Sequence, residues 1–455
     1  MQRAGHQPAQ RQAIIVEQLT RFLQSSPTPW HAVVHMERML SDRGFSVLSE
    51  ESVWSLRPGG RYIIRRQPGA LIAFIIPPET PSSQPDDLPR IHLACAHTDS
   101  PGLNLKPIPC KRKAGNLVLD VEVYGSPLLS TWFDRDLGLA GHVTLIGPDG
   151  GLRQHLIDFG EPVAILPSLA IHLNREANEG YKIRKHEDLS PMLLHPFFSR
   201  DQDPSTAFRN GILQYLGTRH PGEAIQGWEP ISWDLSLYDV VGPQYMGGTK
   251  GWVTGGRLDN LLSCFAAVTA LADATTETNP EAPILPMLAC FNHEESGSLS
   301  HVGAQSNFLS SVLKRLLHLP GRFERTLSRS LMISVDAAHG VHPNFADKHD
   351  GNNAPILNAG VVFKRNANQR YAHSVVAEGM LKGLCRARAI PWQEFAMRAD
   401  MPCGSTIGPM LSAKLGLHAV DLGIASWAMH SIRETAGLND LNHLQSLLTG
   451  FFSSP

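Results

Sequence analysis

The sequence lacks paired cysteines, long apolar runs and an excess of either charge. Its six cysteines are scattered, with no Cys-x-x-Cys pair, which argues against a disulfide framework and against a thiolate zinc site. No apolar run approaches the roughly 20 residues that would span a bilayer, and the first residues lack the apolar core of a signal peptide. The net charge of −2 offers no basic surface for nucleic acid. We therefore expect a protein of the reducing cytoplasm, with neither membrane nor nucleic acid as its partner.

The length of the chain and its pattern of apolar and polar residues indicate one α/β domain that carries an insertion. At 455 residues the chain is too long for one ordinary hydrophobic core. Residues 117–124 alternate apolar and polar side chains, and residues 142–146 end at a Pro-Asp-Gly-Gly turn, a pattern typical of an antiparallel β unit. We therefore expect residues 107–250 to form an inserted, mainly β domain between two parts of an α/β domain, 1–106 and 251–455.

Outside the insertion, helical patterns alternate with short apolar runs. Apolar residues recur at helical spacing in residues 10–45, where we predict two helices. Residues 61–65 and 70–76 predict a pair of strands, and residues 261–271 predict a further helix. Inside the insertion, residues 182–227 are expected to be polar and rich in loops.

Four short apolar runs end in residues that can hold a proton or a metal ion. His97 follows one run, and Glu294 with Glu295 follows a second. Asp336 follows a third, and His430 follows the fourth after a short segment. Such runs are typical of buried, mostly parallel strands, whose carboxyl ends lie at one edge of a sheet. We therefore predict that these five side chains converge at one sheet edge, although they span residues 97 to 430.

The adjacent glutamates favour a metal site at this edge. Two neighbouring carboxylates raise one another's pKa unless a cation or a proton neutralises them. Imidazole and carboxylate ligands suit Zn²⁺, and such a site also accepts Mn²⁺ or Co²⁺. The sequence has no His-Glu-x-x-His motif, which argues against a single-zinc site on a helix. Two alternatives stay open: a solvated acid pair at 294–295, and Asp259 as a helix cap rather than a further ligand.

These residues lie in segments that form an ordered set of motifs. The segments are AHTDSPGLNLKP (96–107), RLDNL (257–261), FNHEESGS (291–298), DAAHGVHPN (336–344), PCGSTIGP (402–409) and MHSIRE (429–434), with shorter matches at 26–31, 132–137 and 169–173. Over nearly the whole chain, the set resembles the aspartyl aminopeptidase family of cytosolic two-metal peptidases. The resemblance implies an α/β fold in which a mixed-sheet, zinc-exopeptidase-like catalytic domain carries an inserted, mainly β dimerisation domain.

The resemblance also implies which residues hold two zinc ions per chain. Asp259 would bridge both ions. His97 and Asp336 would complete the first ion, and Glu295 and His430 would complete the second.

The remaining polar residues of these motifs would move protons or orient ligands. By resemblance, Glu294 is the general base. Asp99 would orient the His97 ring without binding a metal ion itself. The chain departs from the family pattern at Asn292, where Asp is common, and at Ser296, where Val is common. Neither departure removes a ligand, so they put efficiency in doubt more than activity.

Candidates for substrate binding come from the same resemblance. Lys364 would pair with an acidic first residue of the peptide, and His339 would contact the substrate or stabilise the oxyanion. Tyr371 is a weaker candidate of the same kind. His172 is similar to a family histidine that reaches the active site of a neighbouring subunit. For each of them the sequence alone leaves an ordinary structural role open, which for His172 is that of a strand histidine.

The sequence thus predicts an aminopeptidase that prefers peptides with amino-terminal Asp or Glu. The resemblance implies a homododecameric shell that is assembled through the inserted domain. One alternative is a related two-metal exopeptidase or amidohydrolase without acidic specificity. Another is a catalytically silent homologue that forms the shell.

Overall fold

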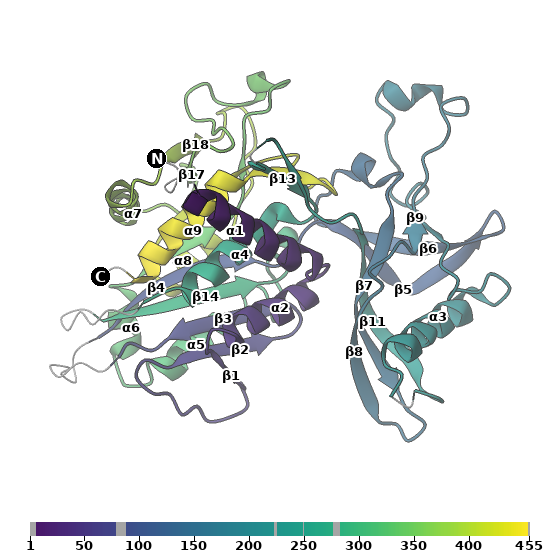
Figure 1. The fold of residues 1–455 in the computed structure, drawn as a ribbon, viewed down its shortest axis with the longest axis horizontal. Coiled ribbons are helices and arrows are strands. Elements are labelled where there is room, and N and C mark those ends of the chain that lie inside the picture. The colour runs from purple at the N-terminus through teal and green to yellow at the C-terminus, as the bar shows by residue number, and fades with distance from the viewer. Residues whose placement is uncertain (1–5, 79–87, 223–224, 249, 276–282, 454–455) are drawn as a thin grey trace. The chain divides into compact units, whose positions relative to one another are not determined.

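The chain folds into two compact units (Figure 1). The computed structural model describes residues 6–78, 88–222, 225–248, 250–275 and 283–453, with side chains from residue 12 onward. Unit 1 comprises Met1–Asp99, Gln244–Met429 and Glu434–Pro455, and unit 2 comprises Ser100–Pro243 and His430–Arg433. The segment expected as an insertion, 107–250, overlaps most of unit 2.

Unit 1 is built on a nine-stranded mixed sheet. The strands lie in the order β1 (Ser46–Leu48), β2 (Arg61–Arg66), β3 (Ala70–Ile75), β14 (Ile284–Phe291), β4 (Arg90–His97), β15 (Leu331–Val335), β19 (His418–Gly423), β17 (Val361–Arg365) and β18 (Trp392–Ala396). The four central strands, β14, β4, β15 and β19, run parallel to one another. Their carboxyl ends therefore lie at the same edge of the sheet.

Both faces of this sheet are covered by helices, because alternate side chains of each strand point to opposite faces. One hydrophobic core joins the sheet to α1 (His6–Gln24), α2 (Pro29–Ser41), α4 (Leu258–Ala272), α7 (Val375–Ala387) and α9 (Leu438–Ser453). The other core joins it to α5 (Phe308–Leu316), α6 (Arg322–Leu327) and α8 (Ile407–Leu415). The two predicted helices of residues 10–45 and the predicted strand pair β2–β3 are confirmed, and the pair is antiparallel.

A smaller five-stranded sheet in unit 1 continues two of the central strands. Its order is β12 (Gln244–Met246), β13 (Trp252–Gly255), β21 (Glu434–Gly437), β20 (Ala425–Trp427) and β16 (Ala338–His339). β16 follows β15 directly and β20 follows β19, and the new pair is again parallel. The chain therefore carries on past the edge of the main sheet in the same direction.

Unit 2 is a seven-stranded sheet with one long helix. Its order is β11 (Glu229–Asp239), β5 (Gly102–Lys113), β6 (Asn116–Tyr124), β10 (Met192–Leu193), β9 (Ala164–Ile165), β7 (Leu137–Ile146) and β8 (Leu152–Asp158), all in antiparallel pairs. Residues 182–227 were predicted to be polar and rich in loops, but this prediction missed α3 (Pro204–Arg219), which lies inside the segment. The side chain of Asp203 accepts a hydrogen bond from the Thr206 amide at the start of α3. This Asp-Pro cap was the local signal for the helix.

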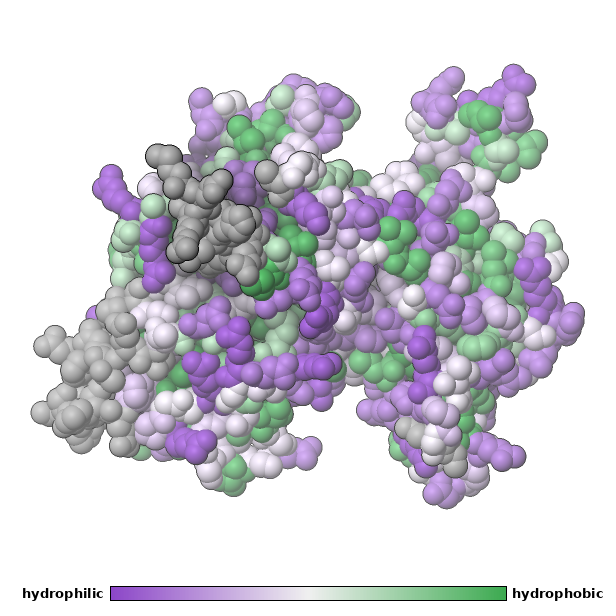
Figure 2. All heavy atoms as spheres, in the orientation of Figure 1, coloured by the Kyte–Doolittle hydropathy of each residue, from purple (hydrophilic) through white to green (hydrophobic). Residues whose placement is uncertain are grey.

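The surface mixes polar and apolar side chains. On the face shown in Figure 2, hydrophilic and hydrophobic residues are interspersed. Among the described residues, no helix combines the length and the apolar character needed to cross a membrane.

Candidate metal centre

The ends of the central strands bring together five of the predicted site residues. His97 is the last residue of β4, and Asp336 directly follows β15. Glu294 and Glu295 lie in a short 3₁₀ turn that begins three residues after the end of β14. Asp259 lies at the start of α4, which packs against β4 and β14. The side chains converge because the parallel strands end at one edge.

The ligand atoms of these side chains lie close enough to share cations. His97 Nε2 is 3.4 Å from Asp259 Oδ1 and 3.3 Å from Asp336 Oδ1. The atoms of this group lie within 4.8 Å of one another, as do those of the group formed by His97, Glu294 and Glu295. Imidazole and carboxylate donors without thiolates fit Zn²⁺ or a similar divalent ion.

The electrostatics of the cluster also fit a bound cation. Burial raises the pKa of Glu294 to about 8. The nearby carboxylates of Asp336, Asp99 and Asp259 also raise this pKa, whereas the charge of His97 lowers it. Burial lowers the pKa of the His97 imidazole, but hydrogen bonds to Asp259, Asp336 and Asp99 hold that pKa well above its usual value. Without a metal ion, protons balance the crowded negative charge. Divalent cations would balance it while leaving the carboxylates ionised.

Asp99 positions both the imidazole and the glutamate turn. Its two carboxylate oxygens accept hydrogen bonds from the backbone amides of Glu294 and Glu295, at 3.1 and 3.0 Å. Oδ1 also lies 3.5 Å from Nδ1 of His97. One buried carboxylate therefore ties the end of β4 to the turn after β14.

Asp259 is not the cap of its helix. The backbone of Asp259 and Asn260 is not helical, so the regular turns of α4 begin at Leu261 and Asp259 lies before the cap position. The backbone amide of Asp259 donates to Glu434 Oε2 at 3.0 Å, and Asn260 Nδ2 donates to the Val335 carbonyl at 2.8 Å. The predicted alternative role as a cap is therefore wrong, and its carboxylate faces His97.

The structure places Lys364 against this cluster. Lys364 is 1% exposed, and its ammonium donates to Asp336 Oδ2 and to the Ala337 carbonyl, both at 3.1 Å. Burial lowers the pKa of Lys364, but the charges of Asp336 and Asp421 raise it above the usual value. The ring of Tyr371 lies 4.8 Å from the Lys364 ammonium, and burial raises the pKa of that phenol. A charged lysine therefore lies directly behind a candidate metal ligand.

The three remaining histidines lie in different settings. His339 ends β16 and packs edge-on against Phe395, with ring centroids 6.0 Å apart. His172 is exposed and lies in a turn of unit 2, so the reading of it as a strand histidine is wrong. His430 belongs to the segment His430–Arg433 of unit 2 and follows the last residue of a unit 1 segment. Its role as a ligand stays a prediction.

Three residues that support the centre were missed at the level of sequence. They are Glu434 and Asn260, described above, and Cys264, whose thiol donates to the His97 carbonyl at 3.0 Å. Glu434 and Asn260 lie inside the motifs at 429–434 and 257–261, so their place in these motifs was the available signal. Cys264 carries no local signal, because only the packing of α4 on β4 brings it there.

The two departures from the family pattern lie at the rim of the glutamate turn. Asn292 donates to the Pro68 carbonyl at 3.1 Å and accepts from the His293 amide at 2.7 Å. The Ser296 hydroxyl donates to the His293 carbonyl at 3.4 Å. Both side chains therefore brace the turn and supply no ligand atom.

Comparison with known proteins decides the family. A family model described as aminopeptidase I zinc metalloprotease (M18) matches residues 22–452. The chain belongs to the M18 family.

Close relatives and solved structures of M18 proteins cover the same length. A probable M18 family aminopeptidase 2 of Ectopseudomonas mendocina is 44% identical, over 97% of this chain and 98% of the relative. The structure of the Ape4 and Nbr1 complex matches with a TM-score of 0.89 and 33% identity, over 98% of this chain and 86% of the other. The S. cerevisiae mApe1 dodecamer matches with a TM-score of 0.80 and 28% identity, over 96% of each chain. By family, the chain is an M18 metallo-aminopeptidase.

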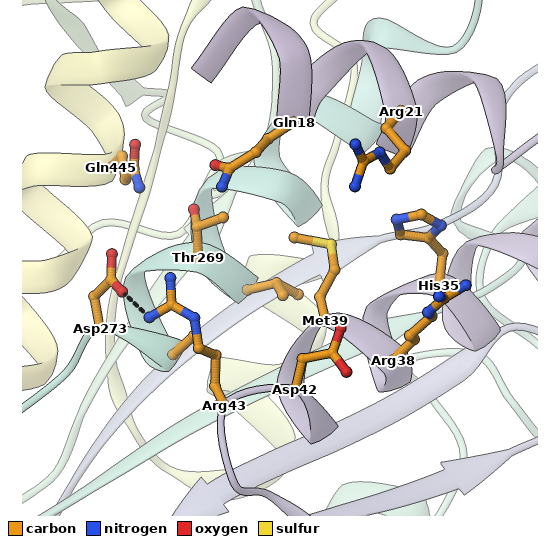
Figure 3. Close-up of a pocket in the computed structure, with 12 residues that line it drawn as sticks. Gln18, Arg21, His35, Arg38, Met39, Asp42, Arg43, Thr269, Asp273 and Gln445 are labelled. Carbon is orange, nitrogen blue, oxygen red and sulfur yellow. Dashed lines mark hydrogen bonds and ion pairs between the residues drawn. The ribbon is translucent and has the colours of Figure 1, made fainter. Parts of the chain in front are cut away.

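A polar hollow lies apart from the predicted M18 site residues. It measures about 280 Å³ and is lined by α1, α2, α4 and α9 side chains, among them Arg21, His35 and Gln445 (Figure 3). Arg43 in its wall pairs with Asp273 at 2.7 Å. None of the residues discussed for the metal centre lines this hollow.

Proposed function

We propose that this chain removes the first residue of peptides by a two-metal mechanism and prefers Asp or Glu in that position. The observation that carries the proposal is the convergence of His97, Asp259 and Asp336 with the adjacent pair Glu294 and Glu295 at one sheet edge. Membership of the M18 family supports the same chemistry.

In the proposed centre, His97, Asp336 and Asp259 hold one ion, and Asp259, Glu295 and His430 hold the second. The donor set favours zinc and accepts manganese or cobalt. Bound ions of this kind lower the pKa of a water molecule and polarise the scissile carbonyl.

Glu294 has the environment that a general base needs. It is partly buried and lies among other carboxylates, which raises its pKa to about 8 in the metal-free chain. As the base, it takes a proton from the attacking water and returns it to the departing amine. Asp99 keeps this carboxylate in place by holding the backbone of the turn.

Lys364 is the proposed source of acidic preference. An ammonium group has three N–H donors, and two of them are used by Asp336 and the Ala337 carbonyl. The third is left for the side-chain carboxylate of a substrate Asp or Glu. His339 and Tyr371 are proposed to line the same substrate.

Assembly into a homododecamer through unit 2 is also proposed. One matched relative is a dodecamer, and unit 2 exposes Leu169, Ile171 and Leu173 around His172, with Leu169 58% and Leu173 75% exposed. Such apolar side chains are typical of interfaces. The six cysteines are free thiols, which supports a reducing, cytoplasmic location.

The proposal is tested by steady-state cleavage of Asp- and Leu-linked chromogenic amides, with an N-acylated amide as the third substrate. We expect activity that chelation removes and zinc restores, with Asp favoured over Leu and no cleavage of the acylated compound. Cleavage of the acylated amide would indicate the amidohydrolase alternative.

Lys364→Ala tests the specificity. We expect a loss of about 10- to 100-fold in kcat/KM for the Asp amide and a much smaller loss for the Leu amide, because only the acidic side chain needs the ammonium group. Lys314→Ala, an exposed lysine on α5, is the control. Metal content is measured for each variant, since Lys364 also neutralises Asp336. An equal loss for both amides at full metal content contradicts the assignment.

A further inference from the structure

A hollow of about 260 Å³ lies beside β16 and β20 in unit 1. Its apolar walls include Phe395, Met397, Met401, Trp427 and Met429. Thioether and aromatic side chains adapt to occupants of varied shape. The hollow is slightly smaller than typical pockets for drug-sized ligands, which begin at about 300 Å³, and it suits one large amino-acid side chain.

A buried hydroxyl group without a partner lines the same hollow. Ser426 is 5% exposed, and within the described part of the chain its Oγ has no hydrogen-bond partner. Burial of an unbonded hydroxyl is costly. Ser426 also lies directly opposite His339 in the β16–β20 pair. The unbonded hydroxyl therefore belongs to a residue in the wall of the hollow beside His339, and it gains a partner there if an occupant or a small shift of the wall reaches it.

The Arg, Asp and Lys residues that line the hollow already have polar partners or lie in solvent. Arg398 binds both carboxylate oxygens of Asp400, at 2.7 and 2.8 Å. Asp350 accepts hydrogen bonds from the backbone and the side chain of Asn353. Lys348 lies beside its chain neighbour Asp347, 3.9 Å away, and its side chain is largely exposed. These residues are therefore engaged elsewhere, and the apolar walls and three histidines of the hollow are left to meet an occupant.

The hollow lies within reach of a peptide bound at the metal centre. His339 follows Asp336 by three residues, and three residues of extended chain span at most about 10 Å. That distance is covered by two or three residues of a substrate peptide. Lys364 and Tyr371, the proposed contacts of the first substrate residue, do not line the hollow.

We propose that this hollow receives the side chain of the substrate residue that follows the scissile bond, that it favours large uncharged side chains, and that Ser426 hydrogen-bonds the peptide there. The inference rests on the proposed function, because it requires cleavage at the metal centre. It adds a selection on the second residue of the peptide to the selection on the first.

The test compares kcat/KM for the tripeptides Asp-Ala-Ala, Asp-Ser-Ala, Asp-Leu-Ala and Asp-Phe-Ala with the zinc-loaded full chain. We expect the Leu and Phe peptides to exceed the Ser peptide by about tenfold or more, which is typical of an apolar pocket. Met397→Ala should lower the Phe-to-Ala ratio several-fold, while Met380→Ala on the exposed face of α7 leaves the ratio unchanged.

The variant Ser426→Ala distinguishes a role of the hydroxyl in substrate binding from a role in protein stability. Since Ser426 Oγ has no partner among the described residues, its removal should leave Tm unchanged or slightly raised, yet raise KM for all four peptides several-fold. A lowered Tm with unchanged KM would overturn the role of Ser426. Cleavage that ignores the second residue refutes this inference alone, whereas no cleavage of any peptide refutes the proposed function and this inference with it.

Discussion

At the scale of residues, Asp99 shows how much one carboxylate organises. Resemblance assigned it the single task of orienting His97. In the structure its two oxygens also accept hydrogen bonds from the backbone amides of Glu294 and Glu295. The turn that carries the proposed base and a proposed ligand is therefore held by the same group that faces the imidazole. Removal of such supporting groups typically costs 10- to 100-fold in metal affinity or activity.

The role of Glu294 leads to a prediction for a single substitution. Glu294→Gln should lower kcat by about 10²- to 10⁴-fold, the usual contribution of a general base, while metal content is retained because the ligands are unchanged. Steady-state kinetics with metal analysis measures both. Glu51→Gln, at an exposed glutamate, is the control. Turnover that survives the change at Glu294 would remove the proposed base.

At the scale of elements, the parallel run β14–β4–β15–β19 places the site. The sequence indicated buried strands that end in His97, the glutamate pair and Asp336. It did not reveal their order in the sheet, because strands that are far apart in sequence pair through packing. The helix α3 was overlooked although its buried residues, among them Phe208, Ile212 and Tyr215, recur at helical spacing.

The end of β19 approaches the backbone of Asp336 closely at Gly423. A Cβ atom at Gly423 would lie 1.9 Å from the Asp336 carbonyl oxygen, so backbone must shift. Gly423→Ala should cost about 1–3 kcal/mol in unfolding free energy and weaken zinc retention, because Asp336 moves. Denaturant unfolding and metal titration measure these effects.

Gly379→Ala is the matched control for Gly423→Ala. A Cβ at Gly379 in α7 meets no atom within 4 Å, and alanine favours a helix by about 1 kcal/mol over glycine. This variant should therefore be as stable as the parent or more stable. If Gly423→Ala behaves like Gly379→Ala, the close approach has no effect on the centre.

At the scale of the whole molecule, unit 2 exposes apolar side chains that a single chain leaves uncovered. Its own sheet and core bury their apolar side chains, yet the turn around His172 leaves Leu169, Ile171 and Leu173 exposed. We propose that an assembly of several copies covers these residues and brings His172 to another chain's site.

Subunit mixing tests this expectation. His172→Ala and Glu294→Gln chains should each be nearly inactive alone, but should regain activity when co-expressed, because some sites then combine an intact Glu294 with an intact His172 from another chain. Light scattering of the parent should give a mass of several chains. If mixed chains stay inactive although they co-assemble, His172 does not act across subunits.

The amino-acid sequence by itself determined the candidate ligands, their order along the chain and membership of an aminopeptidase family, because residue identities and motif spacing are local properties. It also predicted that His97, Glu294, Glu295 and Asp336 follow buried strands. Only the tertiary structure decided that these strands are neighbours, that Asp259 faces His97 instead of capping its helix, and that Lys364 is buried against Asp336. It alone showed the hollow beside Ser426. These features depend on contacts between residues far apart in sequence, which arise when the sheet and its helices pack.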